Sequence, residues 1–93
     1  MIYKVDNGTV TIFLPQRIES SNSEEIRKQL DKCIEESGCD NIIFDSSDTE
    51  YISSAGLRVF MMIYKKHKST KFINLTDNVK EIFDITGFIN IFL

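Results

Sequence analysis

The sequence predicts an α/β fold with a mixed sheet of four to five strands, which opens with an antiparallel hairpin and continues with alternating helices and strands. Its 93 residues fit a single domain. A strong tight-turn signal lies between two β-rich runs near the start of the chain. Short apolar runs then alternate with helical patterns, which favours parallel strands joined by right-handed crossovers.

The opening hairpin is predicted by "IYKV" and "TVTIFL", which flank the turn residues "DNG". Val10, Ile12 and Leu14 alternate onto one face of the second strand, and Pro15 ends it.

A first helix is predicted after "ESSNSEE". Either Ser21 with Glu24 or Asn22 with Glu25 has the spacing of a capping box. Gly38 is the expected stop. The apolar residues of this helix share one face: Ile26, Leu30, Cys33 and Ile34.

The middle of the chain reads as a buried strand, an acidic loop and a second helix. The strand is "NIIFD", the loop is "SSDTE", and the helix starts near Ser54 and runs to about His67. This helix is apolar almost all the way round, whereas a helix on a sheet needs only a stripe. Part of its surface, with Met61 or Met62, is therefore expected either to face a partner or to fill the edge of the core.

The last third predicts a strand, a compact helix and a final strand. The strands are "KFINLT" and "INIFL". In the helix between them, Asn78 and Glu81 have the spacing of a capping pair, and Gly87 is the expected end. Its apolar face comprises Val79, Ile82 and Phe83.

Composition narrows the function classes. The chain is 42% apolar and 27% charged, as is usual for a globular domain. Its net charge of -3 argues against a nucleic-acid partner. Neither a membrane span of roughly 20 apolar residues nor a signal peptide is recognisable, so we expect a cytoplasmic protein without a membrane partner.

No metal or cofactor is expected. Cys33 and Cys39 have the spacing C-x5-C without a second pair, which is not a zinc signature, so both are expected to be reduced. His67 is expected to be a cation near a helix end rather than a catalytic group.

The stretch "YISSAGLRV" begins the second helix unusually. One serine is enough for a cap, which contributes about 1 kcal/mol, yet Ser53 and Ser54 are adjacent. Neither serine has Glu or Gln three residues later, so no capping box explains the pair. Gly56 follows, although glycine costs a helix interior up to about 1 kcal/mol against alanine. Its missing side chain implies that another body comes close.

A helix N-terminus accepts anions, because free N–H groups and the helix dipole favour negative charge. A phosphate on Ser54 would carry about -1.5 to -2 charge at pH 7 in such a place. No histidine or lysine adjoins Ser54 in sequence to activate its hydroxyl. We therefore expect Ser54 to be the substrate of another protein's kinase activity and the chain itself not to be an enzyme.

The element order and the stretch "IIFDSSDTEYISSAGLRVFMMIYKK" resemble the STAS domain of the anti-sigma factor antagonists. "NVKEIFDITGFINIF" resembles that family's helix, glycine and final strand. The resemblance covers nearly the whole chain and implies a single STAS domain over residues 1–93.

The resemblance implies that Ser54 is the phosphorylated serine, with Ser53 left open as a second candidate. Glu19 falls where the family usually has an aspartate that meets the partner kinase. The chain departs from the family at Ser53, Ala55 and Arg58, where aspartate, serine and glycine are frequent. The partner-binding residues implied are Glu19, Ser53, Ser54, Ala55, Gly56, Leu57, Arg58 and Met61.

The resemblance further implies partner switching in the control of transcription. The unphosphorylated protein binds an anti-sigma factor, often a serine kinase, and so frees the sigma factor. Phosphorylation by that kinase releases the antagonist, and a phosphatase of the 2C type resets it. Alternatives are a STAS scaffold that is never phosphorylated, or a module that binds a small ligand or nucleotide at the same helix N-terminus.

An enzyme-like alternative rests on Asp45, Asp48 and Glu50, which could form a metal or phosphoaspartate site as in a response-regulator receiver. A receiver, however, needs an acidic pair after its first strand, and the opening hairpin does not fit it. Solvated loop carboxylates are the simpler interpretation. If the loop folds near Ser54, these three residues would add negative charge there.

Overall fold

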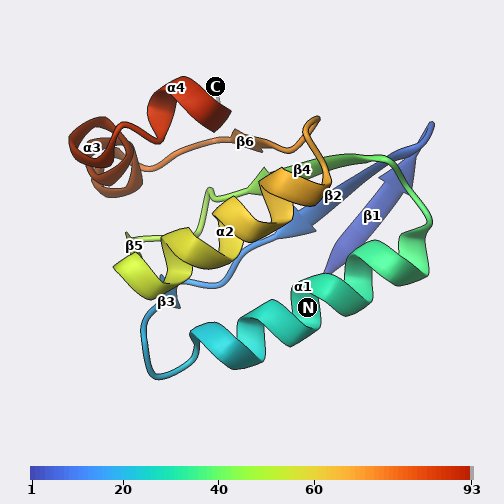
Figure 1. Ribbon diagram of the computed structural model, residues 1–93, viewed down its shortest axis with the longest axis horizontal. Helices are drawn as coiled ribbons and strands as arrows, with labels where there is room; N and C mark the ends of the chain where they lie inside the picture. The colour runs from blue at the N-terminus through green and yellow to red at the C-terminus, as the bar shows by residue number, and fades with distance from the viewer. Residues whose placement is uncertain (93) are drawn as a thin grey trace.

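A four-stranded mixed sheet forms the framework of the computed structural model, which describes residues 1–92 (Figure 1). The strand order is β1-β2-β4-β6; β1 pairs antiparallel with β2, and the other pairs are parallel. A separate two-stranded parallel sheet joins β3 and β5. The strands are β1 (Tyr3–Asp6), β2 (Thr9–Phe13), β3 (Arg17–Ile18), β4 (Asn41–Asp45), β5 (Tyr51–Ile52) and β6 (Lys71–Ile73). The predicted mixed sheet is confirmed, with four strands.

Two long helices lie side by side on one face of this sheet, and two shorter ones gather beyond β6 near β5 (Figure 1). The helices are α1 (Ser23–Ser37), α2 (Ser54–Lys66), α3 (Asp77–Thr86) and α4 (Ile89–Phe92). The left-handed residues Asn7 (φ 49°) and Gly8 (φ 78°) turn the chain between β1 and β2, as the hairpin signal predicts.

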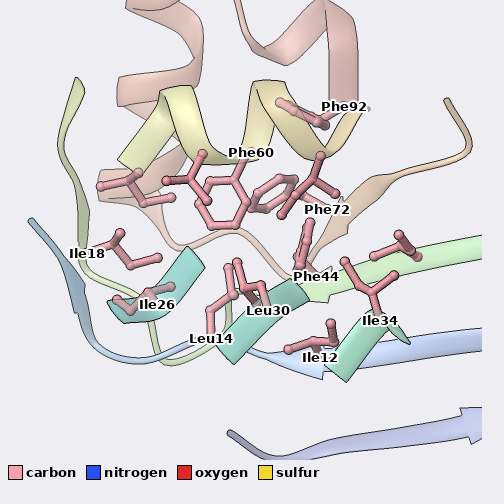
Figure 2. Packing of buried hydrophobic residues seen from close by; sticks show 14 of the residues in the cluster. Ile12, Leu14, Ile18, Ile26, Leu30, Ile34, Phe44, Phe60, Phe72 and Phe92 are labelled. Carbon is pink, nitrogen blue, oxygen red and sulfur yellow. The ribbon is translucent and has the colours of Figure 1, made fainter. Parts of the chain in front are cut away.

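The core lies between the sheet and these helices, as Figure 2 shows. Alternate residues of the central strands face it and are fully buried: Val10, Ile12, Ile42 and Phe44. The predicted stripe of α1 is buried against them, which confirms the helical periodicity. Phe72 is the hub of an aromatic cluster; its ring centroid lies within 5.2 Å of those of Phe44, Phe60, Phe83 and Phe92. Most of these pairs meet edge to face, the arrangement that ring quadrupoles favour.

The predicted last strand, "INIFL", is wrong. Ile89–Phe92 forms the short helix α4, and Leu93 lies outside the described residues. In a strand, Phe88 and Phe92 would be about 13 Å apart along the chain, but in a helical turn they are about 6 Å apart. The helical turn lets both rings reach Phe83, with centroids 6.2 and 6.0 Å away.

Neither predicted capping pair forms. Asn22 is the N-cap of α1, but its side chain accepts from the Glu19 N–H at 2.7 Å and donates to the Arg17 carbonyl at 3.0 Å instead of capping the helix. The cap of α3 is Thr76, whose hydroxyl accepts from the Val79 N–H, so Asn78 lies inside the helix. In both places a short polar side chain forms a hydrogen bond with a backbone group that the capping-box spacing does not include.

Candidate functional site

The two-stranded sheet β3–β5 is the platform on which α2 begins. Ile18 pairs with Ile52, and the Ser53 N–H donates to the Ile18 carbonyl at 2.8 Å. Because the two strands are parallel, the residues that follow them, Glu19 and Ser53, emerge side by side, roughly 4.8 Å apart. The structure therefore brings together two segments that the sequence predicts to share one surface.

The two adjacent serines have different environments. Ser53 is the N-cap of α2, and its hydroxyl oxygen accepts from the Gly56 N–H at 3.2 Å. It is only 9% exposed. Ser54 is the first residue of the helix and is exposed. Across residues 1–92 no hydrogen bond engages its hydroxyl, so one serine caps the helix and the other is free to react.

Gly56 is required by the platform itself. A Cβ atom at this position would lie 2.7 Å from Cγ2 of Ile18 and 2.9 Å from Cγ2 of Ile52. The body that approaches Gly56 is thus the chain's own β3–β5 sheet, whereas the sequence suggested an external one. Leu57 is also buried, at 7% exposure.

The predicted partner-binding residues of α2 fall into two groups, one accessible at the surface and one buried beneath it. Ser54 and Arg58 are exposed, whereas Ala55 and Met61 are half-buried. Ser53, Gly56 and Leu57 lie beneath them and hold the helix start in place.

Glu19 is fixed at the edge of the platform by two contacts. Its carboxylate pairs with Arg17, with Nη2 at 3.0 Å and Nε at 3.1 Å, while its backbone N–H donates to Asn22. The Arg17 guanidinium in turn lies 5.1 Å from the centroid of the Tyr51 ring. An exposed ion pair contributes at most about 1 kcal/mol, so this arrangement orients Glu19 more than it stabilises the fold.

The acidic loop is not gathered at the start of α2. Asp45 follows Phe44 on the strand and so faces away from the helices. Its carboxylate accepts from the Ser47 N–H at 2.9 Å and from Asn74 Nδ2 at 3.1 Å. Burial raises the pKa of Asp45, but these hydrogen bonds outweigh it and leave the pKa below its ordinary value.

Glu50 is placed at the opposite end of β5 from Ser53. Its N–H donates to the Gln16 carbonyl at 2.7 Å, so it precedes the paired residues, roughly 10 Å from Ser53 along the strand. Added negative charge from Asp45, Asp48 and Glu50 was expected only if the loop folded near Ser54, and neither Asp45 nor Glu50 lies beside that serine.

Residues 1–92 contain no cluster of three or more His, Cys, Asp or Glu side chains placed to hold a metal ion. Both cysteines are free and buried, and burial raises the pKa of the Cys33 thiol. Over the same described residues, every helix is too short or too polar to cross a bilayer.

Two open clefts flank the helices. One, of about 520 Å³, lies between the C-terminal ends of α1 and α2, away from Ser54; Ile34, Ile63 and His67 are among its lining residues. The other, of about 390 Å³, adjoins the platform between Tyr51 and α3. Sequence reasoning missed this second cleft, although Ile85, which is 78% exposed on α3, falls outside the apolar stripe of that helix.

Comparison with known proteins decides the family. The sequence profile of the STAS domain matches residues 1–93. The chain belongs to the STAS domain family. This STAS domain is also 31% identical over 93 residues to a protein of Bordetella bronchiseptica that carries the provisional name anti-sigma factor antagonist BtrV. The match covers 96% of the STAS domain and 78% of that relative.

Solved structures share the fold of this STAS domain. A provisionally named anti-sigma factor antagonist of Thermotoga maritima superposes with a TM-score of 0.84 at 22% identity, covering 98% of this chain and 81% of that one. The anti-sigma factor antagonist SpoIIAA in its unphosphorylated form gives 0.78 at 18% identity, covering 99% and 84%. The phosphorylated form of the Bacillus cell fate determinant SpoIIAA gives 0.68 at 17% identity, covering 99% and 89%. At these identities the structures show the fold alone.

Proposed function

We propose that this STAS domain is a phosphorylation-controlled anti-sigma factor antagonist. While Ser54 is unphosphorylated, the start of α2 binds an anti-sigma factor that is also a serine kinase, and phosphorylation of Ser54 releases it. One observation carries the proposal: of the two adjacent serines, Ser54 is exposed and has a free hydroxyl, whereas Ser53 is buried and caps the helix.

Ser54 can accept a phosphate without loss of the fold. The first turn of α2 contains no acidic residue, so no charge within that turn opposes the attraction between the helix dipole and a new anion. Phosphorylation of Ser53 would disrupt the hydrogen bond that its hydroxyl oxygen accepts from the Gly56 N–H, and it would force a buried residue into solvent. The proposal therefore assigns the phosphate to Ser54, which acts as a substrate, while the domain itself is neither an enzyme nor dependent on a cofactor.

The proposed docking surface joins Glu19 on one side of the platform to Ser54, Ala55, Arg58 and Met61 on α2. A partner that accepts a neutral hydroxyl there must desolvate a dianion after phosphorylation, next to the carboxylate of Glu19. Like-charge contacts in an interface cost several kcal/mol, and each 1.4 kcal/mol is a tenfold loss of affinity. A local electrostatic change thus suffices for release without a rearranged backbone.

The relatives named as anti-sigma factor antagonists, SpoIIAA among them, support the choice of partner. The existence of SpoIIAA in a phosphorylated form supports the choice of modification. In the proposed cycle, a 2C-type phosphatase restores the free hydroxyl, and the domain acts in the cytoplasm without nucleic-acid or membrane partners.

A pull-down with the serine kinase encoded nearest in the genome tests the switch. Ser54→Ala is expected to retain the kinase and Ser54→Asp to lose it. Ser69→Asp is the matched control, because it adds the same charge at an exposed serine beyond the other end of α2. Equal retention by Ser54→Ala and Ser54→Asp would overturn the proposal in favour of a scaffold that phosphorylation does not control.

A further inference from the structure

Arg58 is an exposed residue of α2, and within residues 1–92 no ion pair involves its guanidinium. We propose that Arg58 clamps the phosphate of phosphorylated Ser54 within the same helix, so that phosphorylation also withdraws a cation from the docking surface. This inference rests on the proposed modification of Ser54 and adds a regulatory role for Arg58.

Helix geometry places the two side chains together. Ser54 and Arg58 are four residues apart in α2, so their Cβ atoms lie about 5–6 Å apart on one face. An anion that precedes a cation by four residues is the favourable order, and Ser54 also lies at the N-terminus of α2, where the helix dipole favours an anion. A guanidinium can donate two parallel N–H bonds to a phosphate, which a lysine ammonium cannot.

No anion of the described residues is paired with Arg58. Helix α2 contains no Asp or Glu in its whole length, Ser54–Lys66. The ion pairs found in residues 1–92 join Arg17 to Glu19 and Arg27 to Glu24 and Asp31, and none involves Arg58. A phosphate on Ser54 would be the first anion on α2.

Helix α1 shows that this chain forms such pairs when the residues allow it. There, Arg27 pairs with Glu24 at i−3 and with Asp31 at i+4. The alternative cation near Ser54 is Arg17 of β3, but it is already paired with Glu19 and lies against the Tyr51 ring. Arg58 is therefore the available partner for the phosphate.

The clamp makes the charge of the docking surface differ between the unphosphorylated and the phosphorylated state. Before phosphorylation, Arg58 presents a positive charge next to the neutral Ser54 hydroxyl. After it, the guanidinium is turned toward the phosphate, and the surface carries the remaining negative charge. Release of the partner then results from the loss of a cation as well as from the gain of an anion.

Phosphoserine installed genetically at position 54 tests the clamp, because no kinase is needed. The melting temperature is measured with serine and with phosphoserine in the wild type, in Arg58→Gln and in Lys65→Gln, the last removing the same charge from the other end of α2. The stabilisation by phosphate is expected to be about 2–4 °C larger in the wild type and in Lys65→Gln than in Arg58→Gln. Arg58→Lys is expected to retain part of it.

Phosphorus NMR gives a second readout at the phosphate itself. Its second pKa, near 6 in free phosphoserine, is expected to be about 0.3 units lower in the wild type than in Arg58→Gln. The ionisable groups of β3, β5 and the residues next to these strands are unchanged in every variant: Arg17, Glu19, Glu50 and Tyr51. Equal phosphate effects in the wild type and Arg58→Gln, or equal reductions in Arg58→Gln and Lys65→Gln, would overturn the clamp. Failure of the proposed switch would instead appear in the pull-down, which does not use these proteins.

Discussion

The four-stranded sheet and the β3–β5 platform are built in different ways. The sheet is held together by the pairing of its four strands and by buried side chains from the strands and the helices. Phe72 alone contacts four other aromatic rings. The platform has two residues in each strand and depends on single contacts, such as the Ser53 N–H to the Ile18 carbonyl and the fit of Gly56. Stability thus resides mainly in the sheet, whereas the platform presents an exposed hydroxyl that can be modified at little cost to the fold.

The largest effect is expected from Phe72→Ala. Removing the ring leaves a cavity among its four aromatic neighbours, and such substitutions cost about 3–5 kcal/mol. Urea denaturation followed by circular dichroism should show this loss, and Phe72→Leu should lose clearly less. A loss below about 1 kcal/mol would mean that the sheet is not the stable half of the molecule.

Gly56→Ala tests the fit of α2 on the platform. Alanine gains up to about 1 kcal/mol of helix propensity, but its Cβ would clash with Ile18 and Ile52, and overpacking costs about 1–3 kcal/mol. The variant is therefore expected to be less stable in the same denaturation experiment. Unchanged or increased stability would show that α2 does not rest closely on β3–β5.

Ser53→Ala should lose the cap of α2, with a cost of about 1 kcal/mol. Ser53→Asp should retain most of the stability, because aspartate is an equally good N-cap. Ser54→Ala should fall within about 0.5 kcal/mol of the wild type, since its hydroxyl is exposed. Thermal unfolding of the three variants in parallel checks the assignment; the reverse ranking of Ser53→Ala and Ser54→Ala would contradict it.

Asp45→Asn should have the smallest effect, visible in acid. The folded-state pKa of Asp45 is below its ordinary value, so the carboxylate contributes stability above its unfolded pKa, near 3.9, and this is lost as the pH falls through the lower folded pKa. Unfolding followed between pH 6 and pH 2 should therefore show a shallower acid dependence for Asp45→Asn than for the wild type. Identical acid profiles would show that the Asp45 carboxylate does not contribute to the pH dependence of stability.

The sheet was largely predictable from sequence because its signals are local. The hairpin turn and the periodicities of β2 and α1 are all written in neighbouring residues, and the structure confirms them. The strands β3 and β5 were missed because two residues cannot show a period. They form through a bond between segments far apart in the chain, Ser53 to Ile18. The strand expected at "INIFL" failed for a similar reason, since distant rings decide its conformation.

The sequence singles out the residues of the candidate site, but it does not show how the structural roles are divided among them. The double serine, Gly56 and Glu19 were all singled out from the sequence. Which serine caps α2 and which is exposed, however, depends on the residue at which the helix begins after β5. The helix begins at Ser54, so Ser53 is the buried N-cap. The true neighbour of Gly56 was equally hidden, because the sequence shows the missing side chain but not the isoleucines beneath it.

The most direct test of the account is the intact mass of the protein after incubation with ATP and the serine kinase encoded nearest in the genome. The wild type, Ser53→Asp and Ser54→Ala are measured together, Ser53→Asp keeping the cap while removing the competing hydroxyl. The account predicts one added phosphate in the wild type and in Ser53→Asp, and none in Ser54→Ala. A phosphate that persists in Ser54→Ala and disappears in Ser53→Asp would contradict it.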